Sequence, residues 1–511
     1  MPETGAHKSL LPDNEYDRRL LREVHPSDWT NPVPRDRYHL VVVGGGTAGL
    51  VSAAGAAGLG ARVALVERDL LGGDCLNVGC VPSKGMIGAA RAWHGARRAA
   101  DFGAPGIAGA GGDFAVAMER MRRIRADMAP HDGATRFRDL GVDVFLGHGR
   151  FTAPDTIAVD GEKLRFRRAV IATGARAAAI PIPGLAEAGY LTNETVFSLT
   201  DLPCRLAVVG AGPIGCELAQ SFARFGSEVT LLDAAGHILP REDADAAAIV
   251  ERALVRDGVR VLTGVEISGV ARTGNESGER RISFTRAGRL EEIAADEILV
   301  AVGRAANVEN LGLGIAGVEY DPTGIRVDDR LRTTSAKIFA CGDVASAYKF
   351  THTADAQARI VIQNALFFGR VRTSRLVIPW CTYTSPELAH VGLSAADAAR
   401  DGVAIDTVRV PFADVDRALL DGEEEGFLAV HVKKGGDAIV GATIVGAHAG
   451  DMIGELVLAM TAGIGLGKIA ATIHPYPTQG EIIKKAADAW RRTKLTPLAR
   501  RVFAAYFRLV R

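Results

Sequence analysis

The chain has 511 residues, 48% of them hydrophobic and 23% charged, which is enough for about three globular domains. Its 60 basic side chains balance its 60 acidic ones, so its charge gives no reason to expect nucleic acid or an acidic macromolecule as partner. Six cysteines are too few for a secreted disulfide framework, and the N-terminus has no apolar signal-peptide segment, so we expect a cytoplasmic protein.

Residues 1–35 form a polar N-terminal extension. Within it, residues 14–24 carry a short helical pattern, which Pro26 and the prolines after it end. We interpret this stretch as an extension that docks on a neighbour.

A glycine motif follows the first apolar strand, which begins at Tyr38. Its glycines, Gly44, Gly46 and Gly49, allow a tight turn and let the backbone approach a pyrophosphate held at the N-terminus of the next helix. A second strand ends at Glu67, 23 residues after Gly44, where a carboxylate can bind ribose hydroxyls. The stretch therefore predicts a complete dinucleotide-binding βαβ unit.

Residues 71–84 read LGGDCLNVGCVPSK and contain Cys75 and Cys80. If a helix begins near Cys75, the two sulfurs lie about one turn apart and the N–H groups of that turn stabilise a thiolate. We favour a redox-active disulfide over a static bridge or half of a zinc site, because zinc would need a second pair of ligands and the other cysteines are single. Of these, Cys204, Cys341 and Cys381 are expected in the core, and a ligand role for Cys381 is the less favoured alternative.

The same glycine motif recurs later in the chain. A second strand leads into Gly210, Gly212 and Gly215, and the strand after the following helix ends at Asp233, again 23 residues after the first glycine. Two such units imply two dinucleotides, bound by two domains.

Apolar strands at residues 168–174 and 297–304 mark where the chain crosses between these domains. The first ends in a turn formed by Thr173 and Gly174. A later strand delivers Asp343 at its C-terminal end, where open α/β sheets hold ligands. We therefore predict a first domain that is interrupted by the second and completed after it.

The pattern of predicted secondary structure changes at about residue 371. Alternating strands, followed by helices around residues 452–462 and 480–490, predict an α+β domain. The last segment, residues 491–511, holds seven basic residues and no acidic one. Its apolar residues fall roughly on one helical face, and we favour a terminal helix packed on the protein over a membrane-surface helix.

Taken in this order, the two dinucleotide folds, the Cys-x4-Cys pair and the C-terminal domain resemble the class I flavoprotein disulfide reductases. That family includes lipoamide dehydrogenase, glutathione reductase and mercuric reductase. The resemblance implies an α/β fold with two dinucleotide-binding (Rossmann-like) domains, the first interrupted by the second, and a C-terminal α+β dimerisation domain. It also implies FAD in the first fold, a nicotinamide nucleotide in the second, and a homodimer with shared active sites. The implied parts are 1–35 for the N-terminal extension, 36–178 and 304–370 for the FAD-binding domain, 179–303 for the NAD(P)-binding domain, 371–490 for the dimerisation domain and 491–511 for the basic tail.

The resemblance also implies roles for individual residues. Cys75 is similar to the interchange thiol that meets the substrate, and Cys80 to the thiol that faces the flavin and forms the charge-transfer species. Lys84 and Glu217 match the family's ion pair beside the flavin N5, which we prefer to a solvated surface charge at Glu217. The cofactor-binding residues are expected to be Gly44, Gly46, Gly49, Glu67, Thr173, Gly174 and Asp343 for FAD, and Gly210, Gly212, Gly215 and Asp233 for the nicotinamide nucleotide.

The charge of Asp233 bears on the choice of nucleotide. A carboxylate at the end of this strand suits the 2′-hydroxyl of NADH and would repel the 2′-phosphate of NADPH. Arg241, eight residues on, is the nearby candidate for a phosphate partner. We therefore favour NADH over NADPH.

The sequence departs from the disulfide-cleaving members at the loop that supplies their catalytic base. Their His-Pro-Thr-x-x-Glu corresponds here to Tyr476-Pro-Thr-x-x-Glu481, with His474 two residues earlier. A tyrosine with a pKa near 10 is a poor base at neutral pH. Mercuric reductases have a tyrosine at this place, and their CVNVGCVPSK resembles CLNVGCVPSK. They typically end in two adjacent cysteines, however, whereas this chain ends in AAYFRLVR.

We therefore predict an FAD-dependent oxidoreductase that passes a hydride from NAD(P)H through flavin to the Cys75–Cys80 disulfide and on to a thiophilic acceptor. Hg(II) is the best candidate acceptor, and catalysis involves Cys75, Cys80, Lys84, Glu217, Tyr476 and Glu481. One alternative is a reductase of a small or protein disulfide, and another is a redox-sensing or membrane-associated flavoprotein. No resident metal site and no nucleic-acid partner are expected.

Overall fold

The computed structural model describes residues 10–106, 112–273 and 278–510. Residues 1–9 of the predicted extension and Arg511 of the basic tail therefore lie outside the described residues. The chain divides into two compact units. The first is formed by Met1–Gly210, Ser221–Thr230 and Glu266–Arg375, and the second by Ala211–Gln220, Leu231–Val265 and Leu376–Arg511.

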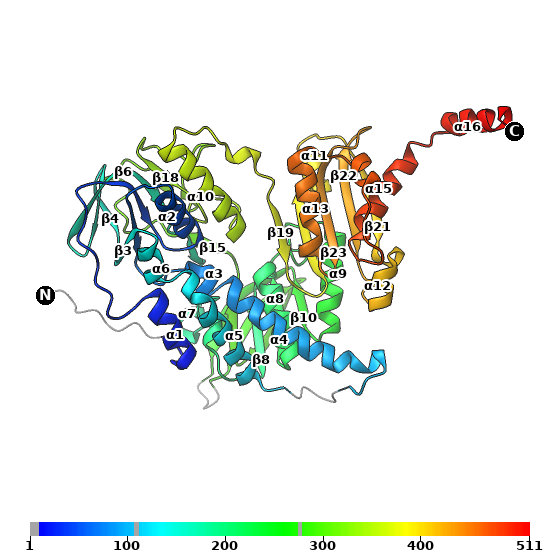
Figure 1. Ribbon diagram of the computed structural model, residues 1–511. Coiled ribbons are helices and arrows are strands. Elements are labelled where there is room, and N and C mark those ends of the chain that lie inside the picture. Colours follow the sequence, from blue (N-terminus) through cyan, green and yellow to red (C-terminus); the bar gives the residue numbers. More distant parts are fainter. Residues whose placement is uncertain (1–9, 107–111, 274–277, 511) are drawn as a thin grey trace. The chain divides into compact units, whose positions relative to one another are not determined.

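A seven-stranded sheet forms the centre of the first unit. Its order is β3-β2-β1-β6-β5-β4, with β18 beside β6, and β1 pairs parallel with both β2 and β6. Helices α2 (Thr47–Gly58) and α10 (Thr351–Leu366) lie side by side and contact this sheet (Figure 1). The strands are β1 (Tyr38–Val43), β2 (Val63–Glu67), β3 (Val142–Leu146), β4 (Arg150–Ala153), β5 (Thr156–Val159), β6 (Glu162–Ile171) and β18 (Ile338–Ala340).

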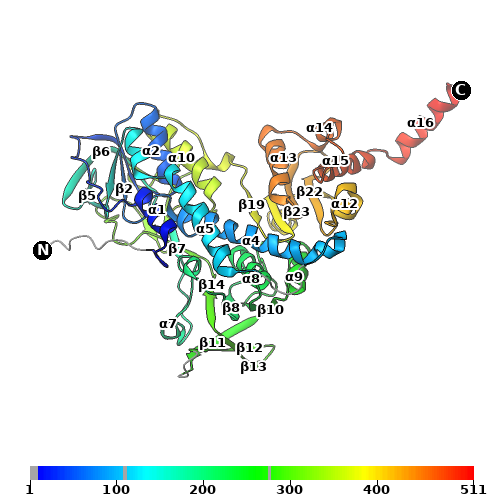
Figure 2. The same cartoon turned by 60° about the horizontal axis from the view of Figure 1, so that its bottom comes forward.

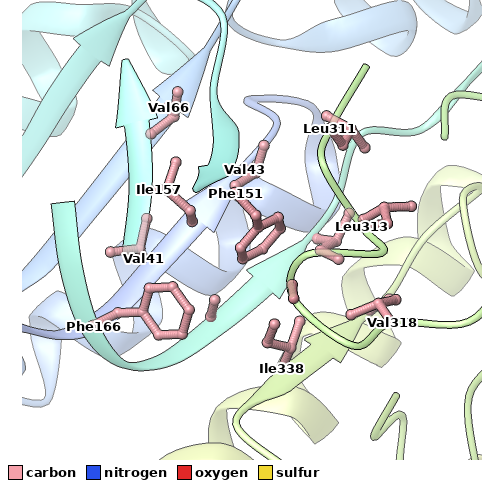
Figure 3. Close-up of a cluster of buried hydrophobic side chains, with 14 of the residues drawn as sticks. Val41, Val43, Val66, Phe151, Ile157, Phe166, Leu311, Leu313, Val318 and Ile338 are labelled. Atoms are coloured by element: carbon pink, nitrogen blue, oxygen red, sulfur yellow. The ribbon is translucent and has the colours of Figure 1, made fainter. Parts of the chain in front are cut away.

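The core beside this sheet joins two distant parts of the chain. Val41 and Phe166, from β1 and β6, belong to the same buried cluster as Leu313 and Ile338 (Figure 3). Strand β18 also pairs parallel with β6, with Phe339 opposite Val170. Because both parts contribute to one hydrophobic core, neither buries its apolar surface alone. The prediction of a first domain that is interrupted and later completed is confirmed, whereas the boundaries of the predicted parts stay predictions.

The N-terminal extension docks on the first unit of its own chain. Helix α1 (Glu15–Val24) begins after Asn14, whose side chain caps it, and confirms the helix predicted at residues 14–24. It packs against α5 (Phe114–Met128). The other helices of this part are α3 (Gly73–Asn77), α4 (Cys80–Arg98) and α6 (Ala134–Asp139).

The second glycine motif follows a strand of a four-stranded sheet of order β10-β9-β8-β14, in which β8 and β14 are parallel. A separate three-stranded sheet, β11-β12-β13, was not predicted from the sequence (Figure 2). The elements are β7 (Ala175–Ala177), α7 (Leu185–Ala188), β8 (Arg205–Val209), α8 (Pro213–Phe225), β9 (Glu228–Asp233), α9 (Ala244–Arg256), β10 (Arg260–Thr263), β11 (Val265–Arg272), β12 (Arg280–Arg286), β13 (Arg289–Ala295), β14 (Glu297–Val300), β15 (Arg304–Ala306), β16 (Tyr320–Asp321) and β17 (Gly324–Ile325).

The C-terminal part confirms the predicted α+β domain. Its five-stranded antiparallel sheet has the order β19-β20-β23-β22-β21. Helix α13 packs on β20 and β23, and α15 packs on β21 and β22. The elements are β19 (Pro379–Thr382), β20 (Glu387–Gly392), α11 (Ala395–Arg400), β21 (Ile405–Pro411), α12 (Asp416–Asp421), β22 (Phe427–Lys433), β23 (Ile439–Gly446), α13 (Ala449–Ala462), α14 (Leu466–Ala471) and α15 (Glu481–Thr493).

The terminal helix α16 (Pro497–Leu509) forms as predicted, but its packing differs from the prediction. None of its residues is buried, so the expectation that its apolar face packs on the protein is wrong for this chain. The side chain of Thr496 caps α16 and begins it as a separate helix after α15. Both views show α16 extending beyond α15 at the end of the chain (Figures 1 and 2).

Candidate active site

The first glycine loop is built for close backbone approach. Gly44 has φ +107°, and a Cβ there would lie 2.3 Å from the carbonyl oxygen of Ala172. A Cβ on Gly49 would lie 1.7 Å from the oxygen of Gly44. At Gly46, in contrast, an added Cβ would meet only Gly73 Cα, at 3.7 Å. The N-terminus of α2 therefore faces room for a pyrophosphate, and the loop fits a dinucleotide.

Glu67 at the end of β2 and Asp233 at the end of β9 hydrogen-bond to the backbone of the two glycine loops in the same way. Glu67 accepts a hydrogen bond from the backbone N–H of Gly45 at 2.5 Å, and Asp233 accepts one from that of Ala211, also at 2.5 Å. Each carboxylate also accepts from the N–H two residues further on, at 2.6 and 2.7 Å. Each carboxylate thus holds the backbone of its glycine loop in place. Each of its oxygens can still accept a second hydrogen bond, for example from a ribose hydroxyl.

The second glycine loop repeats the geometry of the first. Gly210 has φ +106°, and a Cβ there would lie 2.6 Å from the oxygen of Ala301. An added Cβ at Gly212 would meet nothing within 4 Å, so this loop also has room for a phosphate group. Gly215 is buried in the first turn of α8. The residues present therefore fit a second dinucleotide.

The turn formed by Thr173 and Gly174 is held by a residue that the sequence did not single out. Thr173 Oγ1 donates to the carbonyl oxygen of Asn307 at 2.7 Å. The backbone N–H of Asn307 donates to the carbonyl oxygen of Gly174 at 3.0 Å. The Asn307 side chain also donates to the Thr173 carbonyl at 2.9 Å. Gly174 has φ +69°, a conformation that favours glycine.

The two cysteines of the predicted redox pair lie on different helices. Cys75 is in the short helix α3, which ends at Asn77, and Cys80 is the first residue of α4. The expectation that one helix carries both is therefore wrong. The chain breaks at Gly79, where a Cβ would lie 2.7 Å from the carbonyl oxygen of Asp74.

This break gives the two thiols different environments. Cys80 is exposed at the N-terminus of a 19-residue helix, where unpaired N–H groups stabilise a thiolate. Its Sγ also lies 3.4 Å from the hydroxyl of Thr351, the first residue of α10. Cys75 is half-buried, and its contact with the Cys80 thiol and its burial raise the pKa of Cys75 above the usual range. The two thiols of the pair therefore differ in burial and in hydrogen-bond partners.

Asp343 lies just after β18, at the C-terminal end of a strand as the sequence predicts. A partly buried arginine joins it to residues 71–84, the redox loop. Arg304 contacts the carboxylate of Asp74 and lies 3.4 Å from that of Asp343. Lys349 Nζ donates to the Asp343 carbonyl at 2.8 Å. Burial raises the pKa of Asp343, an effect that Arg304 partly offsets. Neither Arg304 nor Lys349 was identified from the sequence, because neither belongs to a motif.

The N-terminal extension also reaches the redox loop. Asp17 of α1 lies 2.7 Å from the guanidinium of Arg125, which donates to the carbonyl oxygen of Asn77 at 2.8 Å. The backbone N–H of Leu71, where the redox loop begins, donates to the carbonyl oxygen of Val24 at 3.2 Å. The extension therefore helps to hold the segment that carries Cys75 and Cys80.

Glu217 is buried in α8, with 5% of its surface exposed, which excludes the less favoured alternative of a solvated surface charge. Its carboxylate accepts a hydrogen bond from the backbone N–H of Tyr383 at 2.8 Å. Lys84 lies in α4, one turn after Cys80. The ion pair of Lys84 with Glu217 stays a prediction.

The loop before α15 presents two candidate groups. Tyr476 is exposed, and its hydroxyl donates to Asp416 at 2.8 Å. This hydrogen bond raises the pKa of Tyr476 above its usual value. His474 Nε2 lies 3.0 Å from Glu455 Oε1, so the histidine is held by a carboxylate. Glu481 begins α15 and lies 3.7 Å from Lys485.

The remaining cysteines do not form a metal site. Cys341 is fully buried, as expected for a core residue, and Cys381 is half-buried. Cys204 is exposed, so its expected core position is wrong; it lies in the turn before β8. Within the described ranges, no three histidine, cysteine, aspartate or glutamate side chains come together to hold a metal ion.

Comparison with known families agrees with the fold and with a separate C-terminal domain. The profile of the pyridine nucleotide-disulphide oxidoreductases matches residues 38–358, and the profile of their dimerisation domain matches residues 378–487. The chain belongs to the class I pyridine nucleotide-disulphide oxidoreductases. It is therefore an FAD-dependent NAD(P)H oxidoreductase with a redox-active disulfide, and its dimerisation domain supports homodimer formation.

Curated relatives include enzymes with different acceptors. A mercuric reductase of Bacillus cereus is 33% identical over 450 residues, covering 88% of this chain and 71% of that protein. A dihydrolipoyl dehydrogenase of Bacillus subtilis strain 168 is 32% identical over 466 residues, covering 88% of this chain and 98% of that protein. These identities are nearly equal, so they do not select the acceptor.

Among solved structures, the Cu(II) complex of the HOCl-induced flavoprotein disulfide reductase RclA from Escherichia coli is similar, with a TM-score of 0.78 and 27% identity. The match covers 89% of this chain and 100% of RclA. None of the helices in the described ranges is long and apolar enough to cross a membrane.

Proposed function

We propose that this enzyme passes electrons from NADH to the Cys75–Cys80 disulfide and from there to a thiophilic metal ion, with Hg(II) as the best candidate. FAD, when bound, relays the two electrons of the hydride to the disulfide. Gly44, Gly46, Gly49, Glu67, Thr173, Gly174 and Asp343 would hold FAD, and Gly210, Gly212, Gly215 and Asp233 would hold the nicotinamide nucleotide.

The preference for NADH rests on the carboxylate of Asp233. Its two oxygens accept from the amides of Ala211 and Ala235, which fixes a negative charge at the end of β9. A ribose 2′-hydroxyl can donate to this carboxylate, whereas a 2′-phosphate would be repelled. Lys84 and Glu217 are assigned to the ion pair that assists hydride delivery.

The two thiols, Cys75 and Cys80, have different roles in the proposed reaction. Reduction of the disulfide by NADH and one proton gives two thiols and NAD⁺. Cys80, at the N-terminus of α4 where a thiolate is stabilised, would exchange electrons with FAD, and Cys75 would receive the acceptor. Transfer of two electrons to Hg(II) then gives Hg(0), reforms the disulfide and releases two protons.

The observation that carries the choice of acceptor is the hydrogen bond from Tyr476 to Asp416. It raises the pKa of the phenol, so Tyr476 is a poorer base than an ordinary tyrosine. A dithiol–disulfide exchange needs a base to take the proton from the Cys75 thiol, whose own pKa is raised. A soft metal ion displaces that proton on binding sulfur and needs no such base.

A second candidate is the reduction of a small or protein disulfide. It is favoured by the contact of His474 with Glu455, because a histidine oriented by a carboxylate is a competent general base. In this case His474 would take the proton that the family's usual histidine takes, and Tyr476 would only shape the site.

The test compares acceptors with NADH and NADPH side by side. Purified enzyme is given Hg(II), Cu(II), lipoamide or glutathione disulfide, and nucleotide oxidation is followed. Faster turnover with NADH and Hg(II), insensitive to His474→Asn, is expected. Turnover restricted to a disulfide and lost in His474→Asn would favour the second candidate.

The electron path is tested separately under anaerobic conditions. NADH should produce a long-wavelength absorbance band in the parent enzyme, which Cys80→Ser abolishes and Cys204→Ser leaves unchanged. Cys204 is a matched control because it is an exposed cysteine outside the pair. An undiminished band in Cys80→Ser would contradict the path.

A further inference from the structure

The terminal helix α16 presents a continuous apolar face that the chain does not cover. Its large apolar side chains are between 50% and 84% exposed. At 100° per residue, most of these side chains fall on one side of the helix. They are Leu498, Val502, Phe503, Tyr506, Phe507 and Leu509.

The opposite face of α16 is charged with one sign only. Arg500, Arg501 and Arg508 fall within about a third of the helix circumference, and Ala504 lies between them. The last acidic residue of the chain is Asp488, nine residues before the helix begins. A helix with aromatic and aliphatic residues on one face and arginines on the other is typical of segments that lie in a membrane interface.

We propose that α16 docks on a membrane surface that carries anionic lipid. The aromatic and leucine side chains would enter the boundary between headgroups and acyl chains, and the arginines would contact lipid phosphates. The helix has 13 residues and is about 20 Å long, which is too short to span a bilayer, so it would lie in the plane of the interface.

Charge and position favour lipid over a second copy of the chain as the occupant. The chain has no net charge, so a second copy offers no general attraction for an arginine face, whereas an anionic bilayer does. The dimerisation profile ends at residue 487, before α16 begins. Lys494 stacks over Trp490, 4.7 Å from the ring centre, and donates to the carbonyl oxygen of Gly435, so the chain is anchored to its domain immediately before the helix. This proposal does not depend on the identity of the electron acceptor.

Vesicle flotation of the full-length holoenzyme tests the proposal. The probes are vesicles of phosphatidylglycerol mixed with phosphatidylcholine, and vesicles of phosphatidylcholine alone. The full-length protein should float with the anionic vesicles, and raising the salt concentration should weaken this binding. Deletion of residues 497–511 should reduce the bound fraction at least tenfold. Each Arg→Gln substitution at positions 500 and 501 should weaken binding about fivefold.

A matched pair of variants separates the apolar face from general effects on the helix. Val502→Ser with Phe503→Ser should abolish flotation, and Ala504→Ser, on the arginine face, should leave it unchanged. Equal flotation of the full-length and shortened proteins would overturn the proposal, as would equal flotation of the two serine variants. Loss of the dimer on deletion of residues 497–511, without vesicle binding by the parent, would show that a second copy covers α16 and would also overturn it.

Discussion

The carboxylate of Asp17 lies 2.7 Å from the guanidinium of Arg125, and the two side chains are 0% and 5% exposed. Arg125 also donates to the carbonyl oxygen of Asn77, between the two redox cysteines. A helix that precedes the region matched by the family profile, residues 38–358, is thereby connected to the loop that carries the two cysteines.

Replacing Asp17 by alanine should destabilise the first unit. The change leaves the buried Arg125 without its counter-charge, which costs about 3 kcal/mol for a buried ion pair. Urea unfolding followed by flavin fluorescence measures the loss. Asp355→Ala, which breaks the exposed pair with Arg359, is the control and should cost roughly 0.5 kcal/mol or less. Equal effects of the two substitutions would contradict a structural role for Asp17.

Replacing Thr351 by valine should make the Cys80 thiolate less stable. The Thr351 hydroxyl lies 3.4 Å from the sulfur, and loss of one such hydrogen bond is worth about 1 kcal/mol, or roughly 0.7 pH units. The long-wavelength absorbance of the reduced enzyme should therefore titrate at higher pH. Thr353→Val is the control, because the Thr353 hydroxyl is buried in the same helix without a hydrogen-bond partner among the described residues. An unchanged titration in Thr351→Val would show that the hydroxyl does not act on Cys80.

Replacing Gly79 by alanine should disturb the redox loop. The new Cβ would lie 2.7 Å from the backbone oxygen of Asp74, so the break between α3 and α4 must open. We expect a loss of about 1–3 kcal/mol in stability and slower closure of the disulfide, measured by thiol titration after reduction. Gly88→Ala, in the interior of α4, is the control, because its Cβ would meet nothing within 4 Å. That variant should be unchanged or stabilised by up to about 1 kcal/mol. Wild-type closure kinetics in Gly79→Ala would refute this account of the break.

The sequence predicts the parts of the site that depend on local geometry. Glu67 and Asp233 each follow the first glycine of their motif by 23 residues, because a strand, a tight turn and a helix of fixed length separate them. Their hydrogen bonds to Gly45 and Ala211 repeat for the same reason. The alternation of strands and helices likewise predicted the two dinucleotide-binding units and the C-terminal α+β domain, but not the sheet β11-β12-β13.

Contacts between distant segments could not be predicted in this way. Asp17 and Arg125 are 108 residues apart, and neither belongs to a recognisable motif. The break at Gly79 depends on its distance from Asp74, which the spacing of the cysteines does not reveal. The exposed face of α16 was expected to pack on the protein, because its apolar periodicity is the same for a core helix and an interfacial helix.

The second unit should lose stability as the pH rises through neutrality because of Glu242. Burial raises the pKa of Glu242 to about 7, and the hydrogen bond from Trp380 Nε1, at 2.6 Å, opposes the shift only in part. The folded protein therefore binds this proton more tightly than the unfolded chain, whose glutamate has a pKa near 4.3. Stability from this group is complete below that pH, falls between the two pKa values, and is lost above about pH 7.

Glu242→Gln keeps an acceptor for Trp380 and removes the titration. The variant should match the parent near pH 4.5 and exceed it by up to about 3 kcal/mol at pH 8, because it never places a charge in this buried position. Thermal unfolding midpoints across this pH range give the comparison. Glu424→Gln, an exposed glutamate in the same unit, is the control and should shift nothing. A constant difference between Glu242→Gln and the parent at all pH values would mean that Glu242 does not titrate as its burial requires.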